Sequence, residues 1–192
     1  EILNWSYGKL ETLNLFIPRL LGGSSTEEVS DDFKKELRAS LESQTDDEEQ
    51  IQAVFDQVAN GVPMYWGDQP GTSGPAYQGA IVVFLAILGF FFAWKKYRYW
   101  ILGASILTIL LAWGSNFLPL SDLFIDYVPL YNKFRAPSSI LVVVELLFPL
   151  IAIIGLYRFY NDEKLTEEYK QKILLYVGGS VLGITLLIIL FA

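Results

Sequence analysis

The chain has 192 residues, of which 53% are hydrophobic and 18% are charged, and its formal net charge at pH 7 is −7. It contains neither cysteine nor histidine, which excludes disulfides, thiolate nucleophiles, imidazole bases and most zinc sites. Residues 1–76 hold 14 of the 21 acidic and 5 of the 14 basic residues, whereas residues 77–192 hold 7 and 9. We therefore expect two parts, an acidic segment over residues 1–76 and an apolar region over residues 77–192.

The acidic segment is expected to be mostly helical. Residues 5–25 carry an apolar stretch broken by Pro18; it is too short and too charged to span a bilayer, so we expect an interfacial or re-entrant segment. One helix is expected after an N-cap at Ser30, and a second is expected to end at Gly61. The acidic run at residues 46–49 is interpreted as a solvated helix N-terminus, not a metal site. Apolar residues recur at helical spacing in both helices: Val29, Phe33, Leu37 and Leu41, then Ile51, Val54, Phe55 and Val58.

Four segments of the apolar region are long enough to cross a bilayer, and Glu145 is their only charged residue. A bilayer core of about 30 Å requires about 20 apolar residues in a helix, and a domain this small cannot bury four helices without a polar face. We therefore expect an all-α integral membrane protein with four transmembrane helices and a mostly helical N-terminal extracytoplasmic segment. The expected helices cover about residues 77–94, 99–118, 137–157 and 173–192.

The basic residues of the loops predict the orientation of these helices. The first and third loops are rich in lysine and arginine, whereas the loop over residues 119–136 has only Lys133 and Arg135. Because cytoplasmic loops carry the excess of basic residues, the first and third loops are expected to face the cytoplasm. Residues 1–76 and the 119–136 loop are then extracytoplasmic. The basic residues of the first and third loops are Lys95, Lys96, Arg98, Arg158, Lys164, Lys170 and Lys172.

The stretch YWGDQPGTSGPAYQGA, residues 65–80, leads into the first apolar helix. Its aromatic residues suit the headgroup layer, and its glycines and prolines favour turns outside the hydrocarbon. One interpretation is an interfacial anchor with a turn. The other is a shaped loop over a pocket, packed against the 119–136 loop with Trp66 largely buried. The residues expected to line such a pocket are Trp66, Asp68, Gln69, Asn132 and Glu145.

A cationic helix start lies within YNKFRAPSSILVVVELLFPL, residues 131–150. Pro137 suits the first turn of the third expected helix, so the free N–H groups of that helix are expected beside Lys133, Arg135 and Ser138. A helix N-terminus with fixed cations is suited to binding phosphate. Snorkelling of the same side chains to lipid headgroups explains them equally well.

Glu145 is expected about two turns inside the third helix, where a charged group is unfavourable unless it faces protein or water. Pro149 cannot donate to the Glu145 carbonyl, which predicts a kink. Two interpretations stay open for this carboxyl: the wall of a cavity, or a hydrogen bond to a tyrosine, serine or threonine of another helix.

Four sequence motifs resemble the later half of the YfhO-like bacterial membrane proteins: ETLNLFIPRLLGG, YWGDQPGTSGPAYQGAI, LAWGSNF and YNKFRAPSS. The resemblance covers essentially the whole chain. That family is similar to the GT-C glycosyltransferases, multi-span enzymes that move a sugar from a polyprenyl-phosphate donor to an acceptor on the outer face. The resemblance implies a multi-pass protein of the bacterial inner membrane. It also implies that Arg135 and Lys133 lie near the lipid phosphate, and that the WGDQP loop shapes the acceptor or donor pocket.

The resemblance further implies that the chain is a piece of a longer protein whose catalytic acid lies upstream of Glu1. No cofactor is evident, and a divalent metal is left open for the full-length protein. The expected partners are membrane lipid, a polyprenyl-phosphate-linked sugar and the upstream part of the same chain, and no nucleic acid is expected. The alternative function is a non-enzymatic one, a lipid-binding transporter or scaffold subunit of a membrane complex.

Overall fold

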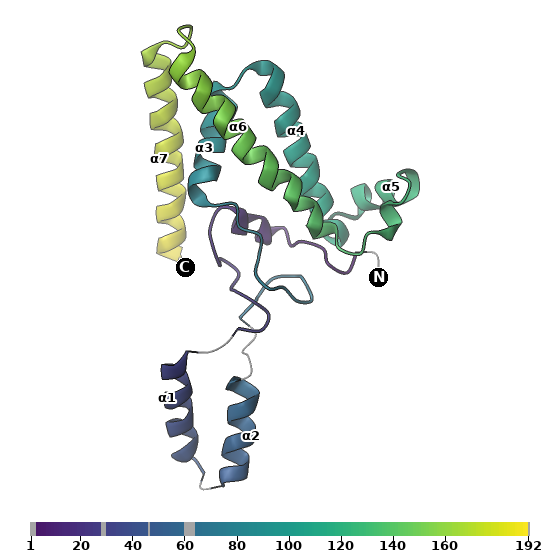
Figure 1. Cartoon of the computed structure of the whole chain (residues 1–192), viewed down its shortest axis with the longest axis vertical. Helices are drawn as coiled ribbons and strands as arrows, with labels where there is room; N and C mark the ends of the chain where they lie inside the picture. The colour runs from purple at the N-terminus through teal and green to yellow at the C-terminus, as the bar shows by residue number, and fades with distance from the viewer. Residues whose placement is uncertain (1–2, 28–29, 46, 60–63, 192) are drawn as a thin grey trace.

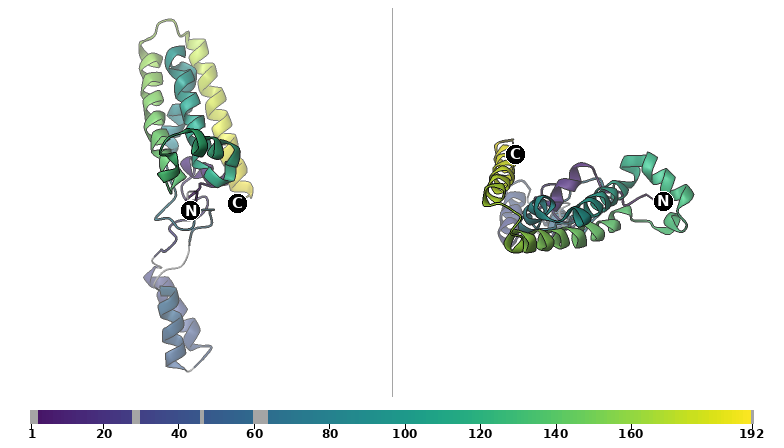
Figure 2. Two further views of the ribbon diagram at one scale, coloured as in Figure 1. Left: turned by 90° about the vertical axis from the view of Figure 1, so that its right-hand side faces the viewer. Right: turned by 90° about the horizontal axis from the view of Figure 1, so that it is seen from above.

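The computed structural model describes residues 3–27, 30–45, 47–59 and 64–191. Across these ranges the regular secondary structure is helical, with isolated bridge residues in addition; Gly22 and Tyr65 form an antiparallel bridge. The all-α expectation is therefore confirmed for the described residues. Four helices stand side by side and form the body of the molecule, as Figures 1 and 2 show. They are α3 (Ala80–Phe92), α4 (Lys95–Ala112), α6 (Val142–Asn161) and α7 (Glu167–Phe191).

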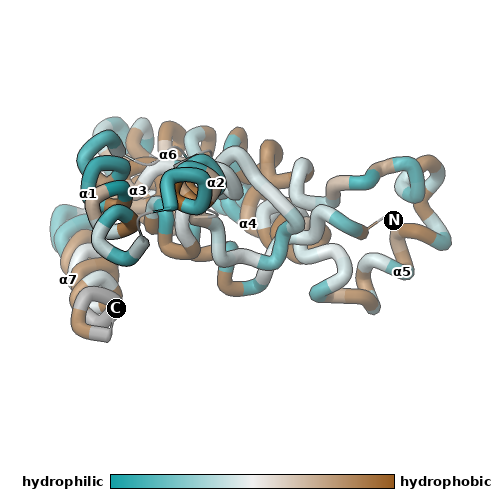
Figure 3. The backbone as a smooth tube through the Cα atoms, turned by 90° about the horizontal axis from the view of Figure 1, so that it is seen from below, coloured by the Kyte–Doolittle hydropathy of each residue, from teal (hydrophilic) through white to brown (hydrophobic). Residues whose placement is uncertain are grey.

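The acidic segment contains the two expected helices, α1 (Asp31–Glu42) and α2 (Glu48–Ala59). The Ser30 hydroxyl accepts a hydrogen bond from the Phe33 N–H at 3.3 Å, so the predicted N-cap is confirmed. The predicted stop at Gly61, the apolar position Val29 and the first residue of the acidic run at 46–49 lie outside the described residues. The two helices pair as a hairpin that projects from the helical body (Figure 1) and is largely hydrophilic (Figure 3).

Contact between α3 and α6 organises the body of the molecule. Gly89 of α3 and Gly155 of α6 face each other so closely that a Cβ atom on either would overlap the backbone of the other helix. Small residues at a helix crossing allow the two backbones to approach. The surrounding core is apolar, and α4 packs on one side of this pair and α7 on the other (Figure 1). Its fully buried members include Ala86, Ile101, Val144 and Ile151.

The first expected transmembrane segment, residues 77–94, is shorter in the structure. Its helix, α3, has 13 residues, about 20 Å at 1.5 Å per residue, because the chain remains non-helical up to Gly79, whose φ is +93°. By length and composition, one helix among the described residues can cross a membrane, the 25-residue unit Pro137–Asn161. That unit joins the 3₁₀ turn η4 (Pro137–Leu141) to α6 and covers the expected third segment.

The second expected segment, residues 99–118, also differs from the structure. Helix α4 begins four residues earlier than expected, at Lys95, and ends at Ala112. The chain then bends by 113° into a helical stretch, Gly114–Tyr127. Helix α4 and this stretch would make a second membrane span only if they are counted together as one broken helix. The bend has a local cause, since Gly114 has φ +47° and Pro119 lies in the first turn of α5 (Leu118–Tyr127). Helix α5 was not expected within the 119–136 loop.

The ends of the helices are grouped as the loop charges predict. The α3–α4 and α6–α7 connections and the helix ends that adjoin them, which together carry most of the basic residues of this region, lie at one end of the bundle (Figure 1). Residues 5–25, residues 64–79 and α5 lie at the other end. The two basic loops therefore share one end, and the segments expected to be extracytoplasmic share the opposite end.

The glycine contact makes a prediction about stability. Gly89→Ala or Gly155→Ala should lower the free energy of unfolding by about 1–3 kcal/mol, because each added methyl group forces the helices apart. The measurement is thermal unfolding of the detergent-solubilised chain, followed by circular dichroism. Gly103→Ala in α4 is the matched control, since a Cβ there meets no atom within 4 Å. It should leave stability unchanged or raise it by up to about 1 kcal/mol. Equal melting curves for all three variants would contradict the close packing.

Candidate functional site

The YWGDQPGTSGPAYQGA stretch packs against the N-terminal segment. The backbone N–H of Trp66 donates to the Leu21 carbonyl at 2.9 Å, and the backbone N–H of Gly23 donates to the Met64 carbonyl at 2.8 Å. These bonds flank the bridge between Gly22 and Tyr65. Residues 21–23 thus satisfy backbone groups of this stretch, and its packing against the 119–136 loop stays a prediction.

A buried carboxylate, Glu11, holds this end of the molecule together. The side chain is 1% exposed, and it accepts hydrogen bonds from the Gly8 N–H and the Tyr65 hydroxyl. The Tyr65 oxygen in turn accepts from the Gln69 N–H at 3.0 Å. Burial, followed by the hydrogen bond to Glu11, raises the pKa of Tyr65 far above its usual value, so this hydroxyl stays protonated and donates. Gln69, an expected pocket residue, thus takes part through its backbone.

A small polar cavity of about 220 Å³ opens beside this carboxylate. It contains two of the expected pocket residues, Trp66 and Asp68. Trp66 is 73% exposed, so the prediction that it is largely buried is wrong: its backbone is fixed by Leu21, but no segment covers the indole ring. The lining residues are Gly8, Lys9, Leu10, Glu11, Leu21, Trp66, Gly67, Asp68 and Asn116.

Sequence reasoning missed Lys9, Glu11 and Asn116 as members of this site. Asn116 donates through Nδ2 to the Tyr7 carbonyl at 3.1 Å and to Asp68 Oδ2 at 3.4 Å. Nothing local marks Asn116, because it reaches the cavity through the bend after α4. Glu11 could have been identified from the sequence, because it is an isolated acid within the otherwise uncharged stretch LETLNLF.

Glu145 lies apart from this cavity. Its side chain is exposed on α6, so neither expected environment, a cavity wall or a hydrogen bond to another helix, is found for it among the described residues. Its backbone has a defined partner, because the carbonyl that Pro149 leaves free accepts a hydrogen bond from Gln78 Nε2 at 3.0 Å. Helix α6 continues through Pro149 to Asn161.

The cationic helix start begins at the predicted position but is not open. Pro137 is the first residue of η4, and Ala136 before it is non-helical with φ −122° and ψ 85°. The Ser138 N–H donates to the Trp5 carbonyl at 3.2 Å, and the Ser139 N–H donates to the Ala136 carbonyl at 3.1 Å. The expectation of free N–H donors at this helix end is therefore wrong for its first two donors, which already have partners in the chain.

The basic residues of this motif are accessible. Asn132, Lys133 and Arg135 are exposed, and neither cation forms an ion pair with any residue in the described ranges. Phe134, between the two cations, is 61% exposed. The side chains of Lys133 and Arg135 are thus available to an anion, and Ser138 contributes to the same turn with its N–H occupied.

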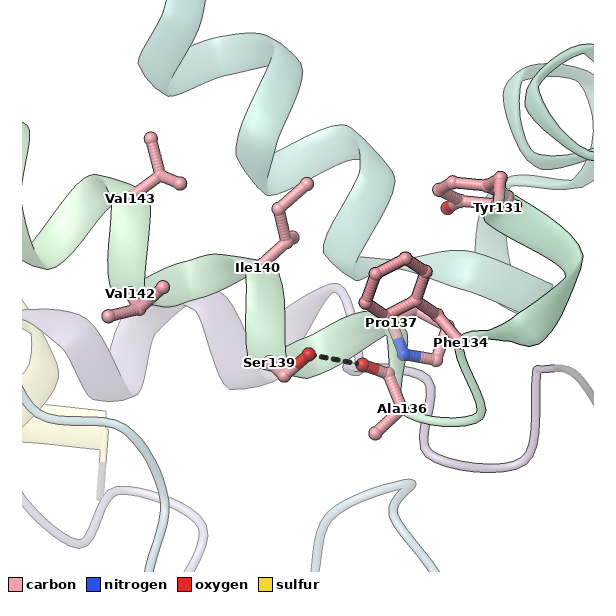
Figure 4. A pocket seen from close by; sticks show the side chains of 8 residues that line it. All are labelled: Tyr131, Phe134, Ala136, Pro137, Ser139, Ile140, Val142 and Val143. Carbon is pink, nitrogen blue, oxygen red and sulfur yellow. Dashed lines mark hydrogen bonds between the residues drawn. The ribbon is translucent and has the colours of Figure 1, made fainter. Parts of the chain in front are cut away.

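An apolar groove of about 340 Å³, drawn in Figure 4, is lined by residues next to these cations in the chain. Phe134 and Ala136, the neighbours of Arg135 in the chain, line it together with Pro137. The Ser139 hydroxyl, which also lines the groove, donates to the Ala136 carbonyl at 2.7 Å. The groove is lined by Tyr131, Phe134, Ala136, Pro137, Ser139, Ile140, Val142 and Val143.

The expected site residues therefore fall into two places. Trp66 and Asp68 line the polar cavity, whereas Lys133 and Arg135 adjoin in sequence the groove residues Phe134 and Ala136. Asn132 and Glu145 line neither. Among the described residues, no group of three or more acidic, histidine or cysteine side chains could hold a metal ion.

The Glu11 network makes a second prediction about stability. Tyr65→Phe removes a donor to the buried carboxylate and an acceptor for Gln69, and should lower the free energy of unfolding by about 1–3 kcal/mol. Tyr160→Phe is the matched control, because Tyr160 is 78% exposed, and it should change stability by less than about 0.5 kcal/mol. Thermal or denaturant unfolding of both variants checks this. If Tyr65→Phe were as stable as Tyr160→Phe, the network would not stabilise the fold.

Comparison of the chain with protein-family models, with curated proteins and with solved structures found no match.

Proposed function

We propose that this chain belongs to a multi-pass protein of the bacterial inner membrane that acts as a GT-C-like glycosyltransferase on a lipid-phosphate-linked sugar. The apolar surface of the helices supports a membrane location. Large apolar side chains are exposed along all four body helices, which is unfavourable in water and favourable in lipid. Examples are Ile81, Phe91, Trp100, Leu102, Ile106, Val142, Leu146, Ile153, Leu175, Leu182 and Leu186.

In the proposed arrangement the four body helices cross the bilayer. Helix α3 is short for a span, so thinning of the bilayer and snorkelling of flanking residues would both have to compensate for the missing length. Helix α5, at 113° to α4, would lie along the outer surface. The basic loops at the opposite end would then face the cytoplasm.

The observation that carries the lipid-phosphate proposal is the apolar groove beside two accessible cations. A groove lined by Phe134, Ile140 and Val143 suits a hydrocarbon or isoprenoid chain. The exposed Lys133 and Arg135 beside it suit the phosphate at the end of that chain, and the arginine offers two parallel donors. The binding energy would come from the groove and the orientation from the cations.

One observation favours the alternative, a non-enzymatic lipid-binding component. The groove has no carboxylate in its lining, and the carboxylates Glu11 and Asp68 line the other cavity. Sugar transfer requires a group that accepts the proton of the attacking hydroxyl. Lipid binding in a transporter or scaffold subunit requires only the groove and its cations.

The membrane arrangement makes a prediction that needs no ligand. The chain has no native cysteine, so Lys96→Cys and Tyr127→Cys place single labels at opposite ends of the body. Both native side chains are exposed, Tyr127 by 79%. In intact cells, a membrane-impermeant maleimide should label Cys at 127 and should label Cys at 96 only after permeabilisation. Labelling of both from the same side would overturn the topology.

The phosphate site makes a prediction about affinity. Arg135→Ala should weaken binding of a short-chain polyprenyl phosphate by about 10- to 150-fold, since a hydrogen bond to a charged group contributes about 1.5–3 kcal/mol. Arg135→Lys should restore part of the affinity, because it keeps the charge and loses the paired donors. Titration of the full chain in detergent measures both. Arg98→Ala, at the opposite end of the body, is the control and should bind as the native chain does.

Two further titrations separate the groove from the cations. The uncharged polyprenol of equal length should bind to native and Arg135→Ala chains with the same affinity. Val143→Trp, which fills the groove, should weaken binding of both the phosphate and the alcohol. If Arg135→Ala bound the phosphate as tightly as the native chain, Arg135 would be a topology anchor and the phosphate site would be wrong.

A further inference from the structure

We infer that the polar cavity beside Trp66 is a saccharide-binding site that takes a single neutral pyranose ring. The inference rests on the proposed function only for the role of that ring as the acceptor of the transferred sugar. Binding itself follows from the cavity, which shares no lining residue with the lipid groove.

The indole ring of Trp66 provides the apolar wall. A tryptophan that is 73% exposed is unusual unless a ligand or partner covers it, since its large ring gains from burial. The backbone that carries the ring is nevertheless fixed, because the backbone N–H of Trp66 donates to the Leu21 carbonyl at 2.9 Å. A Cβ on Gly22 would meet Trp66 Cδ1 at 2.6 Å, so only glycine allows the ring to lie against this backbone. A held, uncovered indole suits the flat apolar face of a sugar ring.

The polar side chains of the cavity suit the hydroxyl groups of a sugar. Asp68 is exposed and its Oδ2 has one long contact, to Asn116 Nδ2 at 3.4 Å. Lys9 is exposed and forms no ion pair within the described ranges. The cavity thus presents an acceptor, Asp68, and a donor, Lys9, to the same ligand, as neighbouring hydroxyls require.

Two glycines keep the cavity open. A Cβ on Gly8 would meet Asp68 Oδ2 at 2.7 Å, and a Cβ on Gly67 would overlap the Glu11 carboxylate and the Tyr65 hydroxyl. Glu11 is already occupied by Gly8 and Tyr65. We therefore assign Glu11 to the rigid floor of the cavity, and Asp68 to contact with the ligand. A preformed wall and floor reduce the entropy lost on binding.

Size and charge narrow the ligand class. A volume of about 220 Å³ is below the roughly 300–1,000 Å³ of sites for drug-sized ligands, which suits one ring better than an oligosaccharide. The acidic side chains of Glu11 and Asp68 disfavour a phosphorylated ligand. A neutral polyhydroxylated ring meets both conditions, of size and of charge, and a cationic ligand is the competing class that the experiment tests.

The experiment is saturation-transfer NMR on the full chain in detergent, with methyl glucoside, methyl galactoside and methyl N-acetylglucosaminide as probes. Saturation should reach the ring protons of at least one glycoside. Trp66→Ala should weaken its apparent affinity by roughly tenfold, and Trp66→Phe should weaken it less, because a smaller aromatic face remains. Asp68→Asn should also weaken binding. Trp100→Ala removes another exposed tryptophan, 50% exposed on α4, and should bind as the native chain does.

Thermal unfolding shows whether each variant remains folded, and the exposed Trp66 and Asp68 side chains should be replaceable without loss of stability. Absence of saturation transfer to any glycoside with the native chain would overturn the inference, and so would equal saturation transfer with Trp66→Ala. Binding of choline or Ca²⁺ at this cavity, without binding of a glycoside, would also overturn it. Failure of the phosphate site is distinguishable, since Arg135→Ala should leave the glycoside signal unchanged and Trp66→Ala should leave polyprenyl-phosphate binding unchanged.

Discussion

The close approach of Gly89 and Gly155 is the contact on which the rest of the structure depends. It brings α3 and α6 together along their length, and two polar contacts then join the same helices at their ends. At one end Arg158 Nη1 donates to the Phe92 and Ala93 carbonyls at 2.9 and 3.3 Å. At the other end Gln78 Nε2 donates to the Glu145 carbonyl at 3.0 Å. Both side chains bond carbonyl groups that have lost a helical partner, so each satisfies a group that would otherwise be unfavourable in an apolar setting.

These end contacts also fix the loops that leave the helices. Arg158 Nε donates to Asp162 at 2.6 Å, and the guanidinium holds the pKa of that carboxyl below its usual range. The turn into α7 is thereby attached to the end of α3. Gln78 acts similarly at the opposite end, because its backbone N–H donates to the Leu15 carbonyl at 3.2 Å and its side-chain amide donates to α6. The N-terminal segment, the glycine-rich stretch and α6 are joined through this one residue.

The result is one end of the molecule with two cavities of different character. The groove beside Phe134 is apolar and is bordered by cations, whereas the cavity beside Trp66 is polar and contains carboxylates. A lipid-linked phosphate suits the first and a sugar ring suits the second. A transferase acting at the outer face needs a site for each, which is why the two proposals fit together while their tests remain separate.

The sequence by itself determined the features that depend on neighbouring residues. Composition and spacing predicted an all-helical chain, the N-cap at Ser30 and the helix start at Pro137, because capping and proline geometry act within one turn. The tertiary structure alone decided the exposure of Trp66, the burial of Glu11 and the occupied N–H of Ser138. The last two depend on groups distant in sequence: Tyr65, which bonds to Glu11, is 54 positions away, and the Ser138 N–H, expected to be free for an anion, donates to the Trp5 carbonyl. Helical periodicity carries no information about such partners, because packing between segments selects them only when the chain folds.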